Sequence, residues 1–155
     1  MAMFNFGNFQ LTPQGAKVIA ELEALKTKQV KVGFLEDAPA YDDGTSVIEV
    51  AAFNEYGDSN TPSRPFMRQS WEAHTSELEA VCGKALTDVA NGGSTADKAA
   101  ALVGAVGVGV IQKEIRDGAF APNAPLTIAR KGSSHPLIDT GHMWQSIHYK
   151  VEDGK

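Results

Sequence analysis

The stretch Ala52-Phe-Asn-Glu-Tyr-Gly-Asp-Ser-Asn-Thr-Pro-Ser-Arg-Pro-Phe-Met-Arg-Gln-Ser70 joins two predicted helices through a stiff bridge. Apolar residues at helical spacing lead into it, and Gly57 can adopt the left-handed conformation that ends helices at low cost. Pro62 and Pro65 fix their own φ angles and hold the residues before them extended, so the bridge is stiff although it is irregular. A second apolar rhythm begins at Phe66 and predicts a long helix, which the bridge couples rigidly to the first.

Helix and strand signals on both sides of this bridge predict one α+β domain. The alternation in Val30–Phe34 and in Ser146–Val151 is typical of strands. We expect a small, mostly antiparallel sheet packed against three or four helices, with one long helix and extended loops. The domain should span residues 12–155, after an arm at residues 1–11 in which aromatic residues alternate with Asn and Gly. The predicted helices begin at Thr12 with Pro13 at the first helical position, at Ser46 (ending at Gly57), at Pro65 (ending near Ala90), at Ser94 or Thr95, and, for one turn, at Asp139 or Thr140.

Composition narrows the class of protein. The chain has 155 residues, a length that suits one domain, and its 43% hydrophobic and 21% charged residues are ordinary for a globular protein. A net charge of −5 argues against a general nucleic-acid binder, which is usually basic. One cysteine, Cys82, excludes an intramolecular disulfide and a cysteine-rich zinc site. With no signal-peptide pattern and no apolar run long enough to span a bilayer, the sequence predicts a soluble protein made in a reducing compartment.

Two segments in the second half of the chain are unusual. Gly104, Gly107 and Gly109 lie in the helix predicted after Thr95, where glycine permits close approach of a neighbouring helix or sheet. That neighbour could belong to another subunit or to the domain's own core, and we favour the core. Residues 119–136 contain prolines and no sustained periodicity, so we predict a long loop that a partner orders.

The bridge also resembles a known motif. Phe53–Gly57 followed by Pro62–Arg68 is similar to the N/H-E-F/Y-G … P-A/S-R-P-F-L/M-R signature of the virion-morphogenesis proteins of tailed bacteriophages. These are neck and tail-completion proteins at the junction of head and tail. A second family-like block runs from Ala124 to Ile147 and includes Pro136-Leu-Ile-Asp-Thr-Gly141.

This resemblance implies a non-enzymatic structural protein that forms a ring, expected to be a hexamer, between the head connector and the tail. The implied partners are further copies of this chain, the connector or adaptor, and the tail tube or tail terminator, with DNA passing through the lumen without sequence-specific binding. No cofactor or membrane is implied. The implied location is the virion, after synthesis in the cytoplasm of the bacterial host. The alternatives are a tail terminator, a minor tail subunit, or a small hydrolase that uses His135, Asp139 and His142.

Arg64 is the residue that we single out in the bridge. Its planar guanidinium can join acceptors on an irregular backbone, for instance Glu55 at the end of the preceding helix, and it could serve within the chain or between subunits. In the long loop we expect Leu126 and Ile128 to be buried on an adjacent subunit, with Arg130 and Lys131 aimed at acidic groups. The candidate anchor or interface residues are Glu55, Tyr56, Arg64, Phe66, Arg68, Leu126, Ile128, Arg130 and Lys131.

The sequence supports a catalytic or metal-binding role less well than a structural role. His135, Asp139, His142 and His148 lie within 14 residues, yet no helical pair of histidines at metal-binding spacing occurs among them. Cys82 and His74 would lie about 12 Å apart along a helix, too far for a hydrogen bond, so we expect Cys82 to be a buried structural thiol. We therefore predict no catalytic residue and no metal ligand in this chain.

Overall fold

The computed structural model describes residues 10–154, which form six helices and two strands. Four helices have ten or more residues, and two are short. In chain order the elements are α1 (Pro13–Thr27), β1 (Lys28–Phe34), α2 (Val47–Tyr56), α3 (Phe66–Ala90), α4 (Ala96–Asp117), α5 (Pro125–Lys131), α6 (His142–Gln145) and β2 (Ile147–Asp153). Of the predicted arm, only Gln10 and Leu11 lie within the described residues.

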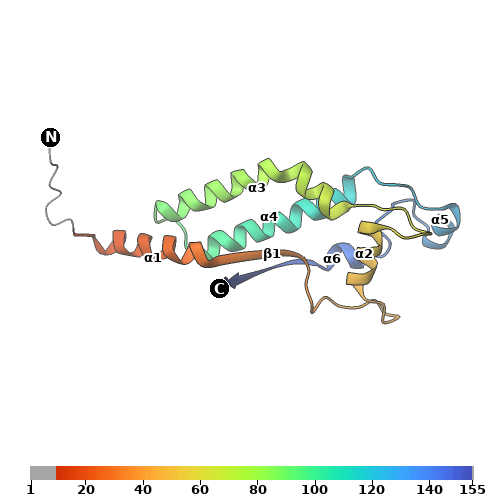
Figure 1. Ribbon diagram of the computed structural model, residues 1–155, viewed down its shortest axis with the longest axis horizontal. Coiled ribbons are helices and arrows are strands. Elements are labelled where there is room, and N and C mark those ends of the chain that lie inside the picture. Colours follow the sequence, from red (N-terminus) through yellow and green to blue (C-terminus); the bar gives the residue numbers. More distant parts are fainter. Residues whose placement is uncertain (1–9, 155) are drawn as a thin grey trace.

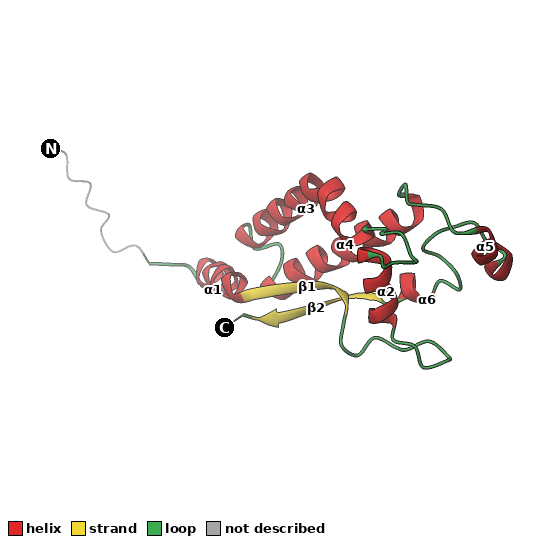
Figure 2. Ribbon diagram, turned by 45° about the vertical axis from the view of Figure 1, so that its right-hand side comes forward, coloured by secondary structure: helices red, strands yellow, loops and turns green. Residues whose placement is uncertain are grey.

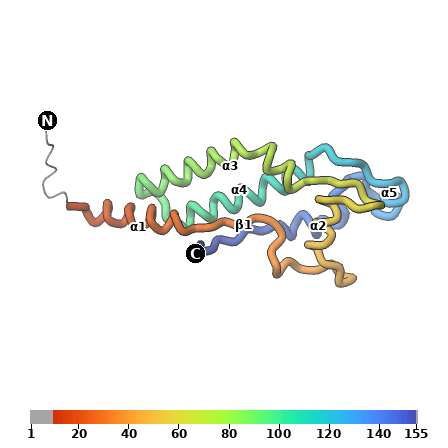
Figure 3. The backbone as a smooth tube through the Cα atoms, viewed as in Figure 1, coloured from red at the N-terminus to blue at the C-terminus, as the bar shows by residue number. Residues whose placement is uncertain are grey.

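The body is elongated and built in layers around α4. β1 and β2 form one antiparallel sheet, in which Val32 faces Tyr149 and Phe34 faces Ile147. One face of α4 packs on this sheet, and α3 runs along α4 (Figures 1 and 2). Figure 3 shows α1 and β1 following one another nearly in line, with β2 returning beside β1. This arrangement confirms the predicted α+β fold with a small antiparallel sheet.

The helix boundaries follow the predicted caps. The hydroxyls of Thr12, Ser46 and Thr95 each accept a hydrogen bond from a backbone N–H in the first turn of the following helix. Gly57 ends α2 with φ 72°, and the backbone of Thr61 and Ser63 lies so close to it that a Cβ atom would clash. α6 is the predicted single turn before β2, but the predicted cap at Asp139 or Thr140 is wrong: the N-cap is Gly141, in the left-handed conformation and without a side-chain cap. The hydroxyl of Thr140 still accepts the N–H of His142.

The glycines of α4 face the sheet of the same domain. A Cβ atom at position 104 would overlap the ring of Tyr149, and one at position 107 would lie 3.0 Å from Val32 Cγ2. Gly104 and Gly107 are buried, whereas Gly109 is exposed with open space around it. Close packing on the domain's own sheet therefore accounts for two of the three glycines.

The main core lies where α2, α3, α4 and the C-terminal segment meet. Val47, Phe66, Ile115 and Ile147 are at most 1% exposed, and Phe34 packs edge-to-face against Phe66 with 6.2 Å between ring centroids. A smaller cluster joins the end of α3 to the start of α4. Its buried members are Ala85, Val89 and Ala99, with Leu22, Leu25 and Val103 packed against them.

Two predictions about irregular structure and burial are wrong. The segment 119–136 was predicted to be a loop throughout, but Pro125–Lys131 forms α5, because Pro125 occupies the tolerated first helical position and Gly132 ends the helix in the left-handed region. Cys82 was expected to be buried but is exposed, because α3 packs on α4 along only one side. Among residues 10–154, no helix is long and apolar enough to cross a membrane.

Candidate functional site

Arg64 connects the proline bridge to two distant parts of the chain. Its backbone N–H donates to Asn54 O at the end of α2, and its Nη1 reaches Asn54 Oδ1 at 3.3 Å. Nε donates to Ala121 O at 2.8 Å, and Nη2 donates to Pro122 O at 3.2 Å and to Asn123 Oδ1 at 3.3 Å. The residue is only 6% exposed, so this network fixes the bridge inside the domain. The structure thus places Arg64 as an anchor within its own chain.

The charge of Arg64 has no carboxylate partner among the described residues. All its acceptors are neutral carbonyl or amide oxygens, and burial lowers the pKa of its guanidinium. The expected contact with Glu55 is therefore wrong. The physical reason is that the carboxylate of Glu55 is used at the start of α3.

Glu55 caps α3 from a distance. Pro65 precedes this helix and offers no side-chain cap, but Glu55 Oε2 accepts from the N–H of Met67 at 2.9 Å, and Oε1 accepts from the N–H of Arg68 at 3.3 Å. Arg68 Nε also donates to Oε1 at 3.0 Å, which forms a salt bridge with a carboxylate that is 8% exposed. A carboxylate at a helix N-terminus is favoured by the helix dipole. Glu55 and Arg68 therefore couple α2 to α3 as structural anchors.

The remaining residues of the bridge divide between core and surface. Phe66 is fully buried and is a core residue. Tyr56 is 73% exposed, and the guanidinium of Arg68 lies 5.9 Å from its ring centroid. Trp71, one turn into α3, is 65% exposed. The surface beside the bridge therefore carries large aromatic side chains.

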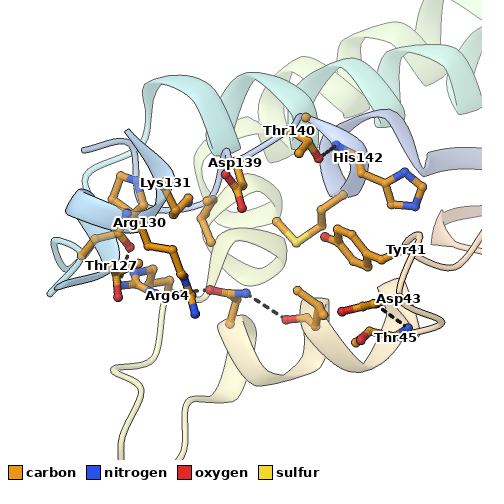
Figure 4. Close-up of a pocket in the computed structure, with 17 residues that line it drawn as sticks. Tyr41, Asp43, Thr45, Arg64, Thr127, Arg130, Lys131, Asp139, Thr140 and His142 are labelled. Carbon is orange, nitrogen blue, oxygen red and sulfur yellow. Dashed lines mark hydrogen bonds between the residues drawn. The ribbon is translucent and has the colours of Figure 1, made fainter. Parts of the chain in front are cut away.

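A polar pocket of about 400 Å³ lies beside the bridge, between α2, α5 and the segment that leads into α6 (Figure 4). Figure 4 shows Arg64, Arg130 and Lys131 at one side of it, and Tyr41 and Asp43 at the other. Burial lowers the pKa of Lys131; Asp139 opposes this change, whereas Arg64 and Arg130 add to it. Burial, followed by Asp139 and Asp43, raises the pKa of Tyr41. The pocket therefore has three cationic side chains at one end and Asp43 at the other, with Asp139 between them (Figure 4).

The four residues predicted to contact a neighbour differ in exposure within one chain. Leu126 is 86% exposed on α5, and Arg130 is exposed, whereas Ile128 and Lys131 are half-buried. Lys131 Nζ donates to His135 O at 3.4 Å. The proposed burial of Leu126 and Ile128 on an adjacent subunit stays a prediction.

The histidines of the C-terminal segment are held by backbone carbonyls. His135 Nε2 lies 2.8 Å from Arg116 O, and His142 Nε2 lies 2.9 Å from Pro39 O. Within residues 10–154, no group of three or more His, Cys, Asp or Glu side chains is arranged to hold a metal ion. On α3, His74 Nδ1 contacts Glu77 Oε2 at 2.9 Å. The contacts of these three rings are structural and provide no pairing of a nucleophile with a base.

Sequence reasoning missed the partners of Arg64. Asn123 is 8% exposed, and it accepts from Arg64 while its Nδ2 donates to His135 O at 3.1 Å. Asn54 supplies two acceptors at the other end of the bridge. Asn54 belongs to the family-like motif, but nothing in the sequence connects either asparagine with Arg64, so only the fold reveals their roles.

Comparison with known proteins gives no match: no family model, curated protein or solved structure is significantly similar to this chain. The arguments that follow therefore rest on the residues and on their geometry.

Proposed function

We propose that this chain is a structural virion protein of a tailed bacteriophage, acting at the head–tail junction as a neck or tail-completion protein. In this role, copies of the chain, expected to number six, form a ring between the head connector and the tail, and DNA passes through the ring. The chain performs no covalent chemistry in this role. Its partners are further copies of itself, the connector or adaptor, and the tail tube or terminator.

The observation that carries the proposal is the way Arg64 ties the first family-like block to the segment that leads into the second. Arg64 belongs to the Pro-Ser-Arg-Pro-Phe-Met-Arg block, and its side chain hydrogen-bonds residues 121–123, directly before the block that begins at Ala124. The motif arginine of the first stretch therefore holds the chain segment from which the second stretch begins. A structural use of this motif supports a protein whose role is architectural.

Two further features support an assembly role. Large apolar side chains lie exposed along the domain, including Tyr56, Trp71 and Leu126, and such surfaces are typical of contacts with other proteins. The net charge of −5 is compatible with a conduit, because DNA phosphates do not adhere to an acidic wall.

The proposal can be tested by deleting the gene from the phage or prophage that encodes this chain. Electron microscopy of the lysate should show filled heads and complete tails that are not joined, and the wild-type gene supplied in trans should restore joined particles. Antibody labelling of intact particles should mark only the head–tail junction. Joined particles with tails of abnormal length would instead assign the chain to tail termination. Normal, infectious particles without the gene would refute a structural role.

A further inference from the structure

An apolar groove runs along the outer edge of β1. We call it the β1 groove: α4 forms its floor with Val103 and Val110, α3 forms one wall with Met67, Trp71 and Cys82, and β1 forms the other. It contains a cavity of about 340 Å³, which adjoins a second cavity of about 560 Å³ that extends toward α2. Both cavities are lined by Val32, Met67 and Trp71, so they lie next to each other.

The backbone on this side of β1 is free to pair. Within the described residues the sheet has two strands, so β1 bonds only to β2 and its other edge has no strand partner. Residues of β1 line both cavities and residues of β2 line neither, so the β1 groove lies at the unpaired edge. An unpaired edge is a template for an added strand, and an apolar groove beside it can receive alternate side chains of that strand.

We propose that the β1 groove receives the N-terminal arm, residues 1–9, of a second copy of this chain, which adds to the edge of β1 as a strand. The arm begins Met-Ala-Met-Phe-Asn-Phe-Gly-Asn-Phe and carries no charged side chain, which matches the apolar walls of the groove. Phe4 and Phe6 are two residues apart, so a strand would direct both rings to the same side. Nine extended residues span about 30 Å, enough to cover the seven residues of β1 at about 23 Å.

The arm of the same chain cannot bring Phe6 to this position. α1 has 15 residues, which separate Thr12 from the start of β1 by about 22 Å, and Val30 lies about 7 Å further along the strand. In the view of Figure 1 α1 leads into β1 with its N-terminal end away from the sheet, and Figure 2 shows that the two elements are inclined to each other. Phe6 is six residues before Thr12 and can reach back at most about 21 Å. Phe6 therefore cannot lie beside Val30 of its own chain.

Exchange of arms makes a head-to-tail contact, because the arm of each copy occupies the groove of the next. Such contacts repeat until a ring closes, or continue as an open chain. This inference deepens the proposed function by naming the segment that joins neighbouring copies, and it rests on that function only for the closure of a ring. The contact itself can be measured with purified protein alone.

Disulfide trapping tests the contact, because Cys82 is the only cysteine and lines the β1 groove. Single cysteines are introduced at each of positions 2 to 9 in the full chain, which is oxidised mildly at high concentration and analysed on non-reducing gels. At least one position should give a ladder of linked multimers that collapses on reduction. The same variant carrying Cys82→Ser, and the unmodified chain, should lack this ladder.

Three other outcomes overturn the inference. A ladder that persists with Cys82→Ser means that arms contact arms, and a disulfide within monomers means that the arm folds back. No linked species at any position means that the arm does not enter the groove. Trp71→Ala, at an exposed side chain that the fold does not need, should reduce the yield of the ladder. If the ladder forms but deletion of the gene leaves particles normal, arm exchange stands and the head–tail role fails.

Discussion

Arg64 and Glu55 hold the two ends of the proline bridge by different chemistry. Glu55 satisfies the free N–H groups at the start of α3 and pairs with Arg68, so its charge is well compensated. Arg64 is buried against four neutral oxygens of Asn54, Ala121, Pro122 and Asn123. A buried charge is costly unless its hydrogen bonds are complete, so the geometry of the bridge depends on all four acceptors.

Replacing Arg64 should destabilise the domain. Arg64→Ala leaves the carbonyls of Ala121 and Pro122 without their donor, at a cost of about 1–3 kcal/mol in the free energy of unfolding. Arg64→Lys should not restore this stability, because an ammonium cannot reach acceptors spread around a planar fork. Urea denaturation measures both effects. The matched control is Arg130→Ala, at an exposed position, which should change stability by no more than about 0.5 kcal/mol. Equal stability of Arg64→Ala and Arg130→Ala would show that the Arg64 network contributes nothing.

At the scale of elements, α4 holds the layers together because it packs closely on both α3 and the sheet. Its buried glycines let the helix backbone approach the side chains of Tyr149 and Val32. Each glycine lowers helix propensity by about 1 kcal/mol relative to alanine, so the close contact with the sheet must offset that loss.

Alanine substitutions along α4 should therefore have opposite signs. Gly104→Ala forces the ring of Tyr149 to move and should lower the free energy of unfolding by about 1–3 kcal/mol. Gly109→Ala adds a methyl group in open space and should raise it by up to about 1 kcal/mol through helix propensity. Thermal or urea unfolding of the two variants measures the difference. If both substitutions stabilise the protein, α4 does not need glycine to pack on the sheet.

At the scale of the whole molecule, the chain presents surfaces that its own fold leaves uncovered. The outer edge of β1 has no strand partner within the described residues, and α5 contains no buried residue. A seven-residue helix without buried side chains has little to stabilise it, because isolated helices of that length are marginal in water. α5 should therefore depend on a partner for its order, although Arg64 anchors residues 121–123 to the domain.

Hydrogen exchange should report that dependence. Amides from Ala119 to His135 should exchange fast in the free subunit, although α5 is helical, and slowly in the assembled particle where Leu126 and Ile128 are covered. The amides of α4 serve as the control and should be protected in both states. Equal protection of Ala119–His135 in both states would mean that this segment packs fully on its own domain.

The sequence by itself determined the elements whose signals are local. Thr12, Ser46 and Thr95 mark helix starts because a cap is made by a side chain and an N–H two or three residues away. The strands could also be predicted, because the alternation of apolar and polar residues along a strand is a local pattern. α5 was missed because the surrounding prolines indicated a loop, although Pro125 is at a position where a helix tolerates proline.

Only the tertiary structure decided which residues meet across the chain. Arg64 finds its main acceptor 57 residues away at Ala121, and Glu55 finds the start of α3 instead of Arg64. The exposure of Cys82 likewise depends on the space left between α3 and β1. A residue's type states what it can donate or accept, but its partner is fixed by how the layers pack around α4.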